Sequence, residues 1–442
     1  MLNTNVKQAL QTQGVVGAGG AGFPTYAKLA DGAEILLINA VECEPLMYTD
    51  FTLTREKLSE IVEGMRLIME YAKIPTGLFA IKDYRALKLG LEDGAALADG
   101  ITVKHIPNVY PMGDEINLIY QATGRLVPPG NLPITKGVIV MNAETVYNAR
   151  EAILFGTPVT EKWLTVGGDV KEAFTLRAPV GMRIRDVLNF VGVDVPETHV
   201  VIDGGPSMGA IKNPDVDVVT KTTKALLILP KTIPAVLNKL RTPEDNLRRA
   251  ASVCCQCTRC TDMCPRHLLG YPIEPHKMVR STLSAAQMTP ELVKTASLCC
   301  GCDICETFAC CQDISPMAIM KEYKAILAKN KMRYVAGADE VFTPNPDRDY
   351  RMLSAQKWKE VMGVAKFDKH TTLIPDLLPA RRVEIRTSQH IGAPSIPVVK
   401  AGDTVTAGQL VAEAANGLSL PQYASIAGKV TYVDATKIII EV

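Results

Sequence analysis

The sequence predicts an α/β protein built from several domains, and three features support this. Residues 1–158 alternate apolar runs with helical patterns, eleven of the twelve cysteines fall in two short runs, and the end of the chain consists of short apolar runs separated by glycine turns. Alternating strands and helices are typical of α/β layers. A chain of 442 residues is long enough for roughly three or four domains, each with its own core.

Five regions differ in texture. In the first, 1–158, we expect strands at 34–39, 77–82, 101–106 and 137–141, and helices at 6–13, 51–72 and 114–123. The others are a small β-rich domain at 159–235 with a helix at 183–191, a helical cysteine-bearing domain at 243–330, a polar connector at 331–377, and short strands and turns at 378–442. Thr289 before Pro290 predicts a helix start that leads toward the second cysteine run.

Charge and hydropathy exclude several classes of function. The chain has 48 basic and 47 acidic residues, so it has no strong field that would attract nucleic acid. No apolar run approaches the ~20 residues that cross a bilayer, so no membrane insertion is expected. This many thiols in a long chain without an apparent signal segment indicate a reducing compartment, and the cytoplasm is the expected location.

The cysteine runs have the spacing of iron–sulfur ligands. The first run reads C-x2-C-x2-C-x3-C-P, as in bacterial ferredoxins, and the second repeats its opening. Zinc ribbons need only paired C-x-x-C motifs, and disulfide frameworks suit small secreted chains, so both alternatives are disfavoured. The sequence therefore predicts two [4Fe–4S] clusters held by Cys254, Cys257, Cys260, Cys264, Cys299, Cys302, Cys305 and Cys310.

Crossed ligation, in which each motif gives its last cysteine to the other cluster, is the pattern of two-cluster ferredoxins. It would add Cys310 to the first three thiolates of the first run, and Cys264 to the first three of the second. No proline follows Cys310, and Cys311 remains an alternative for its position. Cys255 and Cys300 are left over and are expected to pack as small buried hydrophobic residues.

A glycine loop near the start of the chain reads G-x-G-x-x-G from Gly17 to Gly22. Glu42 follows twenty residues beyond Gly22, at the offset of a ribose-binding acid. The loop follows a helical segment, however, where the dinucleotide-binding fingerprint follows a strand, so a tight connecting turn is an alternative. Successive small residues would still let backbone N–H groups approach a phosphate.

Four motifs in order resemble a family of flavoproteins: Gly17–Thr25 with Lys28, Asn39–Pro45, Tyr110–Glu115 and Asn142–Thr145. Together they are similar to the flavin-binding subunit of respiratory complex I and more so to the C subunit of Rnf-type complexes. Most of all, nearly the whole chain resembles the cobalamin reductases of propanediol-utilization microcompartments. Ala18 departs from the arginine of the complex I subunit, and Asp114 from a glutamate.

The resemblance implies a complex-I-flavoprotein-like domain that binds FMN against the glycine loop and NADH on the flavin. Lys28 and Asn142 would lie near the phosphate and ribityl chain, and Phe23 near the nicotinamide. The residues it assigns to the cofactors are Gly17, Gly19, Gly20, Gly22, Phe23, Lys28, Asn39, Glu42, Tyr110, Gly113, Asn142 and Thr145. Those it assigns to catalysis at the NADH site are Glu44, Asp114 and Glu115.

The resemblance also assigns the smaller domains. It implies a β-grasp domain at 159–235, in which the glycines of Asp203–Gly209 form a turn, although alone they could suggest another phosphate loop. It implies a ferredoxin-like domain at 243–330 and a barrel-sandwich hybrid at 378–442. The stretch Glu413–Leu418 has no lysine of the kind that carries biotin or lipoate, so no attached cofactor is expected.

The parts are chemically consistent with one another. NADH gives two electrons as a hydride whereas a cluster takes one, and a flavin converts between the two. The expected activity is NADH-dependent reduction of corrinoid cobalt, with an adenosyltransferase and a microcompartment shell protein as implied partners and a location in or beside the microcompartment. His267 lacks the aspartate of a cobalt-ligating motif, so a visiting corrinoid substrate is expected. An electron donor to another reductase, an Rnf-like subunit and a non-catalytic cluster relay remain alternatives.

Overall fold

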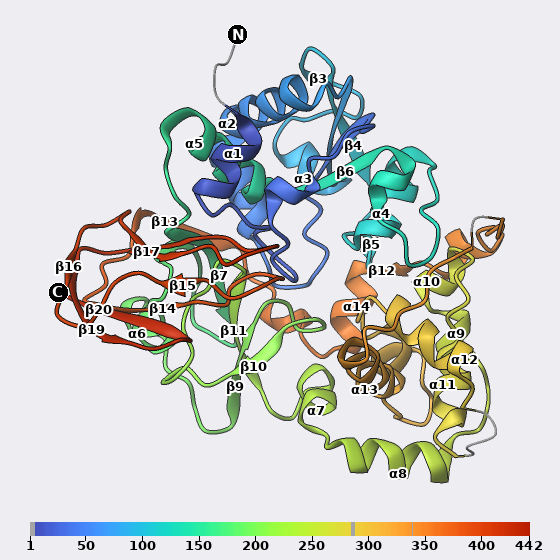
Figure 1. Cartoon of the computed structure of the whole chain (residues 1–442). Coiled ribbons are helices and arrows are strands. Elements are labelled where there is room, and N and C mark those ends of the chain that lie inside the picture. Colours follow the sequence, from blue (N-terminus) through green and yellow to red (C-terminus); the bar gives the residue numbers. More distant parts are fainter. Residues whose placement is uncertain (1–4, 284–287, 338) are drawn as a thin grey trace.

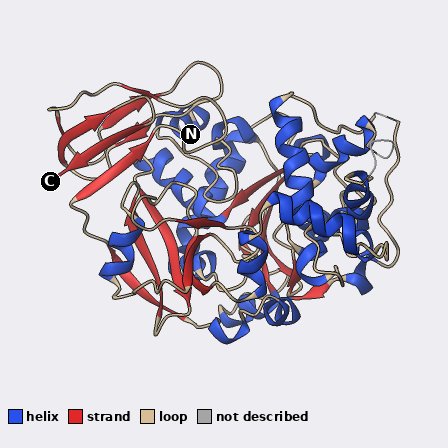
Figure 2. Ribbon diagram, turned by 90° about the horizontal axis from the view of Figure 1, so that it is seen from below, coloured by secondary structure: helices blue, strands red, loops and turns tan. Residues whose placement is uncertain are grey.

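The computed structural model describes residues 5–283, 288–337 and 339–442 (Figure 1). The N-terminal α/β region lies at the top of the view, the helical cysteine region at the lower right, and the C-terminal strands at the left. Turned by 90°, the molecule shows most of its strands on one side and most of its helices on the other (Figure 2). Within the described ranges, no helix combines the length and the apolar character that spanning a bilayer requires.

The N-terminal region contains a five-stranded sheet with the order β3-β4-β2-β1-β6. Four strands run parallel, namely β1 (Ile35–Asn39), β2 (Thr76–Lys82), β4 (Ile101–Ile106) and β6 (Val138–Asn142), and β3 (Ala96–Ala98) is antiparallel at the edge. The four predicted strands are confirmed to within a residue. Their near-continuous apolar runs reflect burial on both faces of the sheet.

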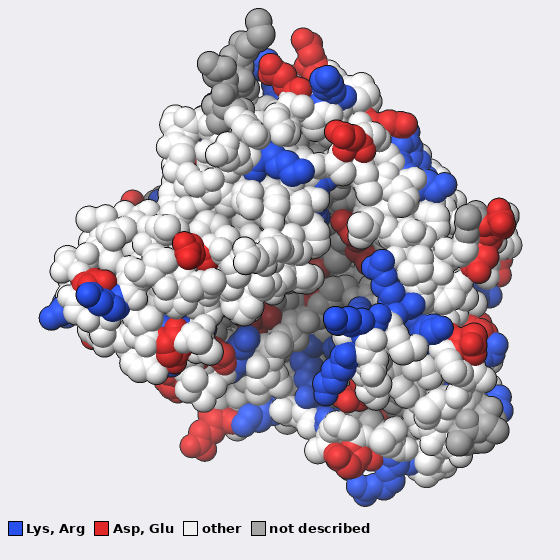
Figure 3. Space-filling model, in the orientation of Figure 1, with Lys and Arg blue, Asp and Glu red and all other residues white. Residues whose placement is uncertain are grey.

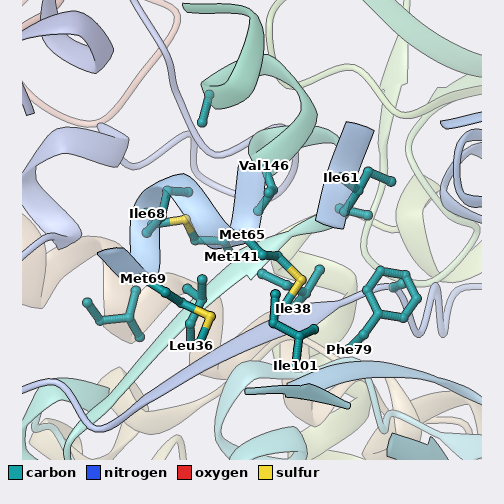
Figure 4. Close-up of a cluster of buried hydrophobic side chains, with 14 of the residues drawn as sticks. Leu36, Ile38, Ile61, Met65, Ile68, Met69, Phe79, Ile101, Met141 and Val146 are labelled. Atoms are coloured by element: carbon teal, nitrogen blue, oxygen red, sulfur yellow. The ribbon is translucent and has the colours of Figure 1, made fainter. Parts of the chain in front are cut away.

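Helices α1 (Val6–Thr12), α2 (Thr49–Ala72) and α5 (Ala143–Phe155) form the core over one face of this sheet. Figure 4 shows Met65, Ile68 and Met69 of α2 packed over Leu36 and Ile38 of β1. Burying each such side chain contributes about 1.5–3 kcal/mol. Gly64 lets α2 approach α5 closely, since a Cβ there would stand 2.7 Å from the Val146 carbonyl oxygen.

The opposite face of the same sheet packs against the cysteine region. Side chains alternate along a strand, so Leu37 points away from Leu36 and Ile38. It belongs to a core shared with α4 (Glu115–Thr123) and α13 (Pro316–Lys329). Short β5 (Val109–Tyr110) and α3 (Asp83–Lys88) complete the region. The N-terminal sheet and the cysteine region therefore share one hydrophobic core.

A second sheet occupies the region that we expect to be a β-grasp domain, with α6 (Ile184–Phe190) against it. Its order is β10-β9-β11-β7-β8-β13, from β7 (Glu161–Gly168), β8 (Ala173–Pro179), β9 (His199–Asp203), β10 (Ala210–Lys212), β11 (Ala225–Pro230) and β13 (Thr371–Leu377).

The segment expected to be a polar connector, 331–377, contains ordered elements. Its β13 runs parallel to β8, its β12 (Leu353–Ser354) pairs with β5, and its α14 (Ala355–Val361) carries the fully buried Trp358. The local polar composition did not reveal these elements, because their pairing partners lie far away in sequence. This stretch joins the N-terminal region to the β-grasp sheet.

The cysteine region is helical, with α7 (Pro234–Leu240), α8 (Pro243–Val253), α9 (Arg259–Asp262), α10 (Pro265–Leu268), α11 (Pro275–Ser281), α12 (Pro290–Thr295) and α13. Thr289 caps α12 as predicted, its hydroxyl accepting from the Leu292 N–H.

Two small sheets form the C-terminal sandwich around one apolar core. One contains β14 (Arg382–Arg386), β20 (Lys437–Glu441), β19 (Gly428–Val433) and β16 (Thr404–Val405), and the other β15 (Ile396–Pro397), β17 (Leu410–Glu413) and β18 (Gln422–Tyr423).

Candidate functional site

Polar residues gather where the parallel strands of the first sheet end, which is the edge where ligands bind in open α/β sheets. Asn39 ends β1 and its Nδ2 donates to the Gly113 carbonyl at 2.9 Å. Asn142 ends β6, caps α5 by accepting from the Glu144 N–H at 3.2 Å, and donates to Asp50 at 2.9 Å. The structure thus brings together three residues that the sequence assigns to the cofactor.

The glycine loop closes on itself beside this edge. The Gly17 N–H donates to the Phe23 carbonyl at 2.9 Å, and the Ala18 N–H donates to Thr145 Oγ1 at 2.9 Å, which holds the loop at the first turn of α5. Gly20 has a φ of 60°, and a Cβ built there would meet nothing within 4 Å. The loop therefore presents an open backbone face, as phosphate binding requires.

Behind the loop lies a buried group of charges that the sequence did not reveal. Lys162 contacts Glu144 and donates to the Ala18 carbonyl at 2.9 Å, and Lys224 contacts Asp50 and lies 3.3 Å from Glu144. Burial lowers the pKa of Lys162 to about 8. Glu144 falls within a quoted motif, but both lysines come from the β-grasp domain, so only the fold unites them.

Lys28 and Glu115 border the open side of this edge. The Lys28 ammonium donates to the Val140 carbonyl at 2.9 Å and lies 3.6 Å from Glu115 in the first turn of α4. Both side chains are partly exposed. They are therefore accessible to a ligand, in contrast to the acids that follow β1.

Glu42 is turned into the protein. It is 7% exposed, pairs with buried Arg85, and accepts from the backbone N–H groups of Asp50 at 2.9 Å and Phe51 at 3.3 Å. Its carboxylate orders the start of α2 and the loop after β1. The sequence around Glu42 did not predict this ion pair, because Arg85 lies 43 residues away.

Glu44 is held by the β-grasp domain. Its carboxylate accepts from Tyr110 Oη at 2.8 Å and from the backbone N–H groups of Ser207 at 2.9 Å and Met208 at 3.4 Å. A Cβ on Gly205 would stand 1.9 Å from its Oε2. The glycine turn of Asp203–Gly209 therefore binds the carboxylate of Glu44 within the same chain.

A cavity of about 230 Å³ is lined by the loop from Glu42 to Tyr48, with Lys82 and Lys359 also in its wall. Lys82 is 3% exposed, and burial followed by the Arg85 charge lowers its pKa to about 8. Basic side chains also gather along one rim of the central hollow on the face shown in Figure 3. The overall neutral charge of the chain concealed this local concentration.

Asp114 and Arg266 connect the cofactor edge to the cysteines. Asp114 caps α4, and its Oδ1 lies 2.7 Å from the partly buried guanidinium of Arg266, two residues after Cys264. Burial opposes the positive charge of Arg266, but Asp114 raises its pKa above the usual range. Tyr110 stacks on Trp358, with ring centroids 4.9 Å apart, in a core that also contains Cys302.

The cysteines line two separate small cavities. The first is walled by Cys254, Cys255, Cys257, Cys260, Cys310 and Cys311, and the second by Cys264, Cys299, Cys300, Cys302 and Cys305. Each cavity thus contains four thiols from one run, three of them predicted ligands, together with the last one or two cysteines of the other run. This division is the one expected from crossed ligation.

Cys310 and Cys311 differ in their surroundings. Cys310 is half-buried and its Sγ accepts from the Ile314 N–H at 3.3 Å, whereas exposed Cys311 lies 3.7 Å from Cys255 Sγ. Cys310 and Cys260 line the same cavity, and burial, then the neighbouring Cys310 thiol, raises the pKa of Cys260 to about 12. Although Cys255, Cys257 and Cys311 also lie together, that exposed trio excludes Cys260. Cys311 Sγ also lies 3.9 Å from Cys257 Sγ, so both Cys310 and Cys311 stand at the first cavity. Cys255, which we expected to be buried, is exposed, and Cys300 is half-buried.

Three family models match parts of the chain. The family model of the Nuo51 FMN-binding domain matches residues 10–151, that of the 4Fe-4S dicluster domain matches 253–315, and that of the RnfC barrel sandwich hybrid domain matches 363–441. These matches confirm the expected fold class and the FMN and [4Fe–4S] cofactors.

Curated relatives match almost from end to end. The chain is 37% identical to the cobalamin reductase PduS of Salmonella typhimurium over 433 residues, which cover 97% of this chain and 94% of that protein. The corresponding protein of Citrobacter freundii is 36% identical over the same shares. An NAD+-reducing [NiFe]-hydrogenase chain matches with a TM-score of 0.46 and 20% identity, over 73% of this chain and 61% of that chain. By its identity and coverage, this chain belongs to the family of the cobalamin reductase PduS.

Proposed function

We propose that this protein oxidises NADH at FMN, passes single electrons through two [4Fe–4S] clusters, and reduces corrinoid cobalt. The observation that carries the proposal is the contact between the two sites: Asp114, at the cofactor edge, is paired with Arg266, which follows the cluster ligand Cys264. An electron converter and its carriers are thus fused in one packed unit. The corrinoid substrate follows from the names of the relatives.

The chain supplies a suitable cradle for FMN. The open backbone at Gly20 and the partly exposed Lys28 offer donors and positive charge to a phosphate. Asn142, whose amide is held by Asp50 and Asn39, would fix the wall beside it. Asn39 and Gly113 would position the flavin side of the site. When bound, FMN supplies the conversion of one hydride into two single electrons.

We assign different roles to the four acids. Asp114 and Glu115 begin α4 at the ligand-binding edge and would contact the dinucleotide or the flavin. Glu42 and Glu44 act as positioning residues, because their carboxylates hold Arg85, α2 and the Ser207 turn. Basic side chains along the central hollow would favour the approach of anionic NADH (Figure 3).

The second-motif thiols would hold the cluster that lies nearer to the cofactor edge. Its ligand Cys302 shares a hydrophobic core with Tyr110, and its ligand Cys264 lies beside the Asp114–Arg266 pair. The cysteines of the first cavity include exposed Cys257 and lie toward the surface. Proximity favours this arrangement because a carrier must lie close to its donor.

The electrons released by NADH balance those taken up by cobalt. Each NADH gives NAD+, one proton and two electrons, which reduce two Co(II) to two Co(I), or one Co(III) to Co(I). Co(I) is short-lived in air and water, so the product needs a consumer. An adenosyltransferase that traps Co(I) is the proposed partner, and a microcompartment shell protein a second one, with the protein located in or beside that compartment.

The test combines three measurements under argon. Purified protein with FMN and NADH should reduce a viologen or ferricyanide dye, reduce hydroxocobalamin, and yield adenosylcobalamin when an adenosyltransferase and ATP are added. Dye reduction without cobalt reduction would retain the oxidoreductase and remove cobalamin as its acceptor, in favour of another reductase partner. Failure to bind FMN or to bleach it with NADH would leave only a cluster relay.

A further inference from the structure

A cavity of about 550 Å³ opens between α7 and α8 on one side and α13 on the other. Leu247, Ile319 and Ile326 give it an apolar wall, and Asn246 and Thr282 add polar groups. Its volume lies in the range of small-molecule sites, which are mostly apolar with a few polar groups that fix orientation. Neither the flavin site nor the cluster ligands account for it.

This cavity adjoins the second cysteine cavity. Asp303 and Met317 line both, so one layer of side chains separates the two spaces. Asp303 lies between Cys302 and Cys305 in the sequence, with a φ of 68° that turns the chain around the cysteines. A molecule in the cavity would therefore lie close to the cluster that we place next to the flavin.

Asn246 points to a hydrogen-bonding ligand. It is 4% exposed and its Oδ1 is buried, yet this oxygen has no hydrogen-bond partner among the described residues. Leaving such an acceptor unpaired costs about 1–3 kcal/mol, and native structures rarely retain one without a reason. A ligand that offers an N–H group to the cavity would pair it.

The charges around the cavity are of both signs. Asp303 and Glu306 are countered by Lys239 and Lys321, and Lys239 is fixed by donating to the carbonyls of Ser207 at 2.6 Å and Gly209 at 2.8 Å. A mixed rim of this kind gives no preference for a highly charged molecule. It suits a neutral one with polar groups at its edge.

We propose that this cavity is the docking site of the corrinoid acceptor, with the apolar face of the corrin ring against Leu247 and Ile326 and a peripheral carboxamide donating to Asn246 Oδ1. A corrin ring has the required chemistry, since its apolar plate is edged with neutral carboxamides. Cobalt takes up one electron at a time there, two per NADH, from the cluster held by the second-motif cysteines. This inference rests on the proposed function and adds to it the place where the substrate binds.

The first test blocks the cavity with Leu247→Trp. Leu247 is 47% exposed, so a larger side chain can be accommodated without repacking the core. The matched control is Leu240→Trp, at a residue of α7 that is 46% exposed and outside the cavity lining. Equilibrium dialysis with hydroxocobalamin should give a Kd at least tenfold weaker for Leu247→Trp than for the control and the unaltered protein, with NADH-dependent dye reduction unchanged.

The second test removes the acceptor with Asn246→Leu, which keeps the volume. The lost hydrogen bond should weaken hydroxocobalamin binding by about tenfold. If both variants bind and reduce hydroxocobalamin as the control does, the inference is overturned while the proposed function stands. If the unaltered protein reduces dye but no cobalamin, the proposed function fails. The dialysis then still tests the docking site, because equal binding by all variants, or no binding at all, overturns this inference.

Discussion

Asp114 and Arg266 form a largely buried ion pair, 2.7 Å between Oδ1 and Nη2, that joins the cofactor edge of the first sheet to the cysteine region. The two residues are 152 positions apart in the sequence. Asp114 also caps α4, so the pair fixes the orientation of that helix relative to Cys264. Flavin-type and cluster sites are therefore held at a fixed separation by charge as well as by apolar packing.

Removing one member of the Asp114–Arg266 pair should destabilise the folded protein. Arg266→Met leaves the Asp114 carboxylate buried without its partner, and we expect the free energy of unfolding to fall by about 3–5 kcal/mol. Adding Asp114→Asn, which keeps an N-cap side chain, should restore part of the loss. The control is Arg185→Met in the surface pair with Asp215, with an expected effect of about 0–1 kcal/mol. Urea unfolding of the unaltered protein and the three variants measures these free energies. Equal decreases for Arg266→Met and Arg185→Met would contradict the structural role of the Asp114–Arg266 pair.

The identity of the fourth ligand can be decided by iron content. Because Cys310 is half-buried and its Sγ accepts an N–H bond, whereas Cys311 is exposed, Cys310→Ser should reduce the iron of anaerobically reconstituted protein from about eight to about four per chain. Cys311→Ser should retain about eight. Iron and acid-labile sulfide analysis supplies the measurement, and the reverse pattern would assign the position to Cys311.

The glycine loop predicts a selective effect on FMN. An alanine at Gly20 would project into the open space before the loop and should weaken FMN binding at least tenfold. Gly32→Ala is the control, because Gly32 also has a positive φ, 83°, and nothing within 4 Å of its Cβ position, but it lies outside the loop. Both substitutions carry a similar backbone strain of about 1 kcal/mol. Fluorescence titration with FMN should separate them, and equal affinities would remove the loop from the flavin site.

Lys221 predicts a pH dependence of stability. Its ammonium is buried and donates to the carbonyls of Gly14 at 3.0 Å and Pro421 at 3.4 Å, and burial lowers its pKa to about 7. In the unfolded chain the pKa is about 10.4, so between these values the unfolded state binds more protons. Stability should therefore rise from about pH 7 to about pH 10, by up to about 1.4 kcal/mol per unit from this group.

The measurement is the difference in slope between the unaltered protein and Lys221→Met, from urea midpoints taken across that pH range. Lys221→Met should be the more stable at pH 7 and should lack this part of the rise. Lys7→Met, at an exposed position of α1, is the control and should leave the slope unchanged. A parallel pH profile for Lys221→Met would show that Lys221 keeps its charge in the fold.

The sequence by itself determined the local elements and the ligand types. Hydrophobic periodicity located the four parallel strands and helices α2 and α4 to within two residues, because burial on a strand or helix repeats over short distances. Cysteine spacing predicted two clusters because three thiolates of one cluster come from a single tight loop. The motif order was enough to predict an FMN domain, and the comparisons confirmed it.

Only the tertiary structure decided what each polar group faces. Glu42 and Glu44 look alike in the sequence, yet one pairs with Arg85 and the other with the Ser207 turn. The strand Thr371–Leu377 was hidden in a polar segment, since its partner β8 lies some two hundred residues earlier. The cavity beside Asn246 likewise needs helices from separate parts of the chain. Contacts of this kind join residues that are far apart in the sequence and depend on how the elements pack, so a local pattern of residues cannot predict them.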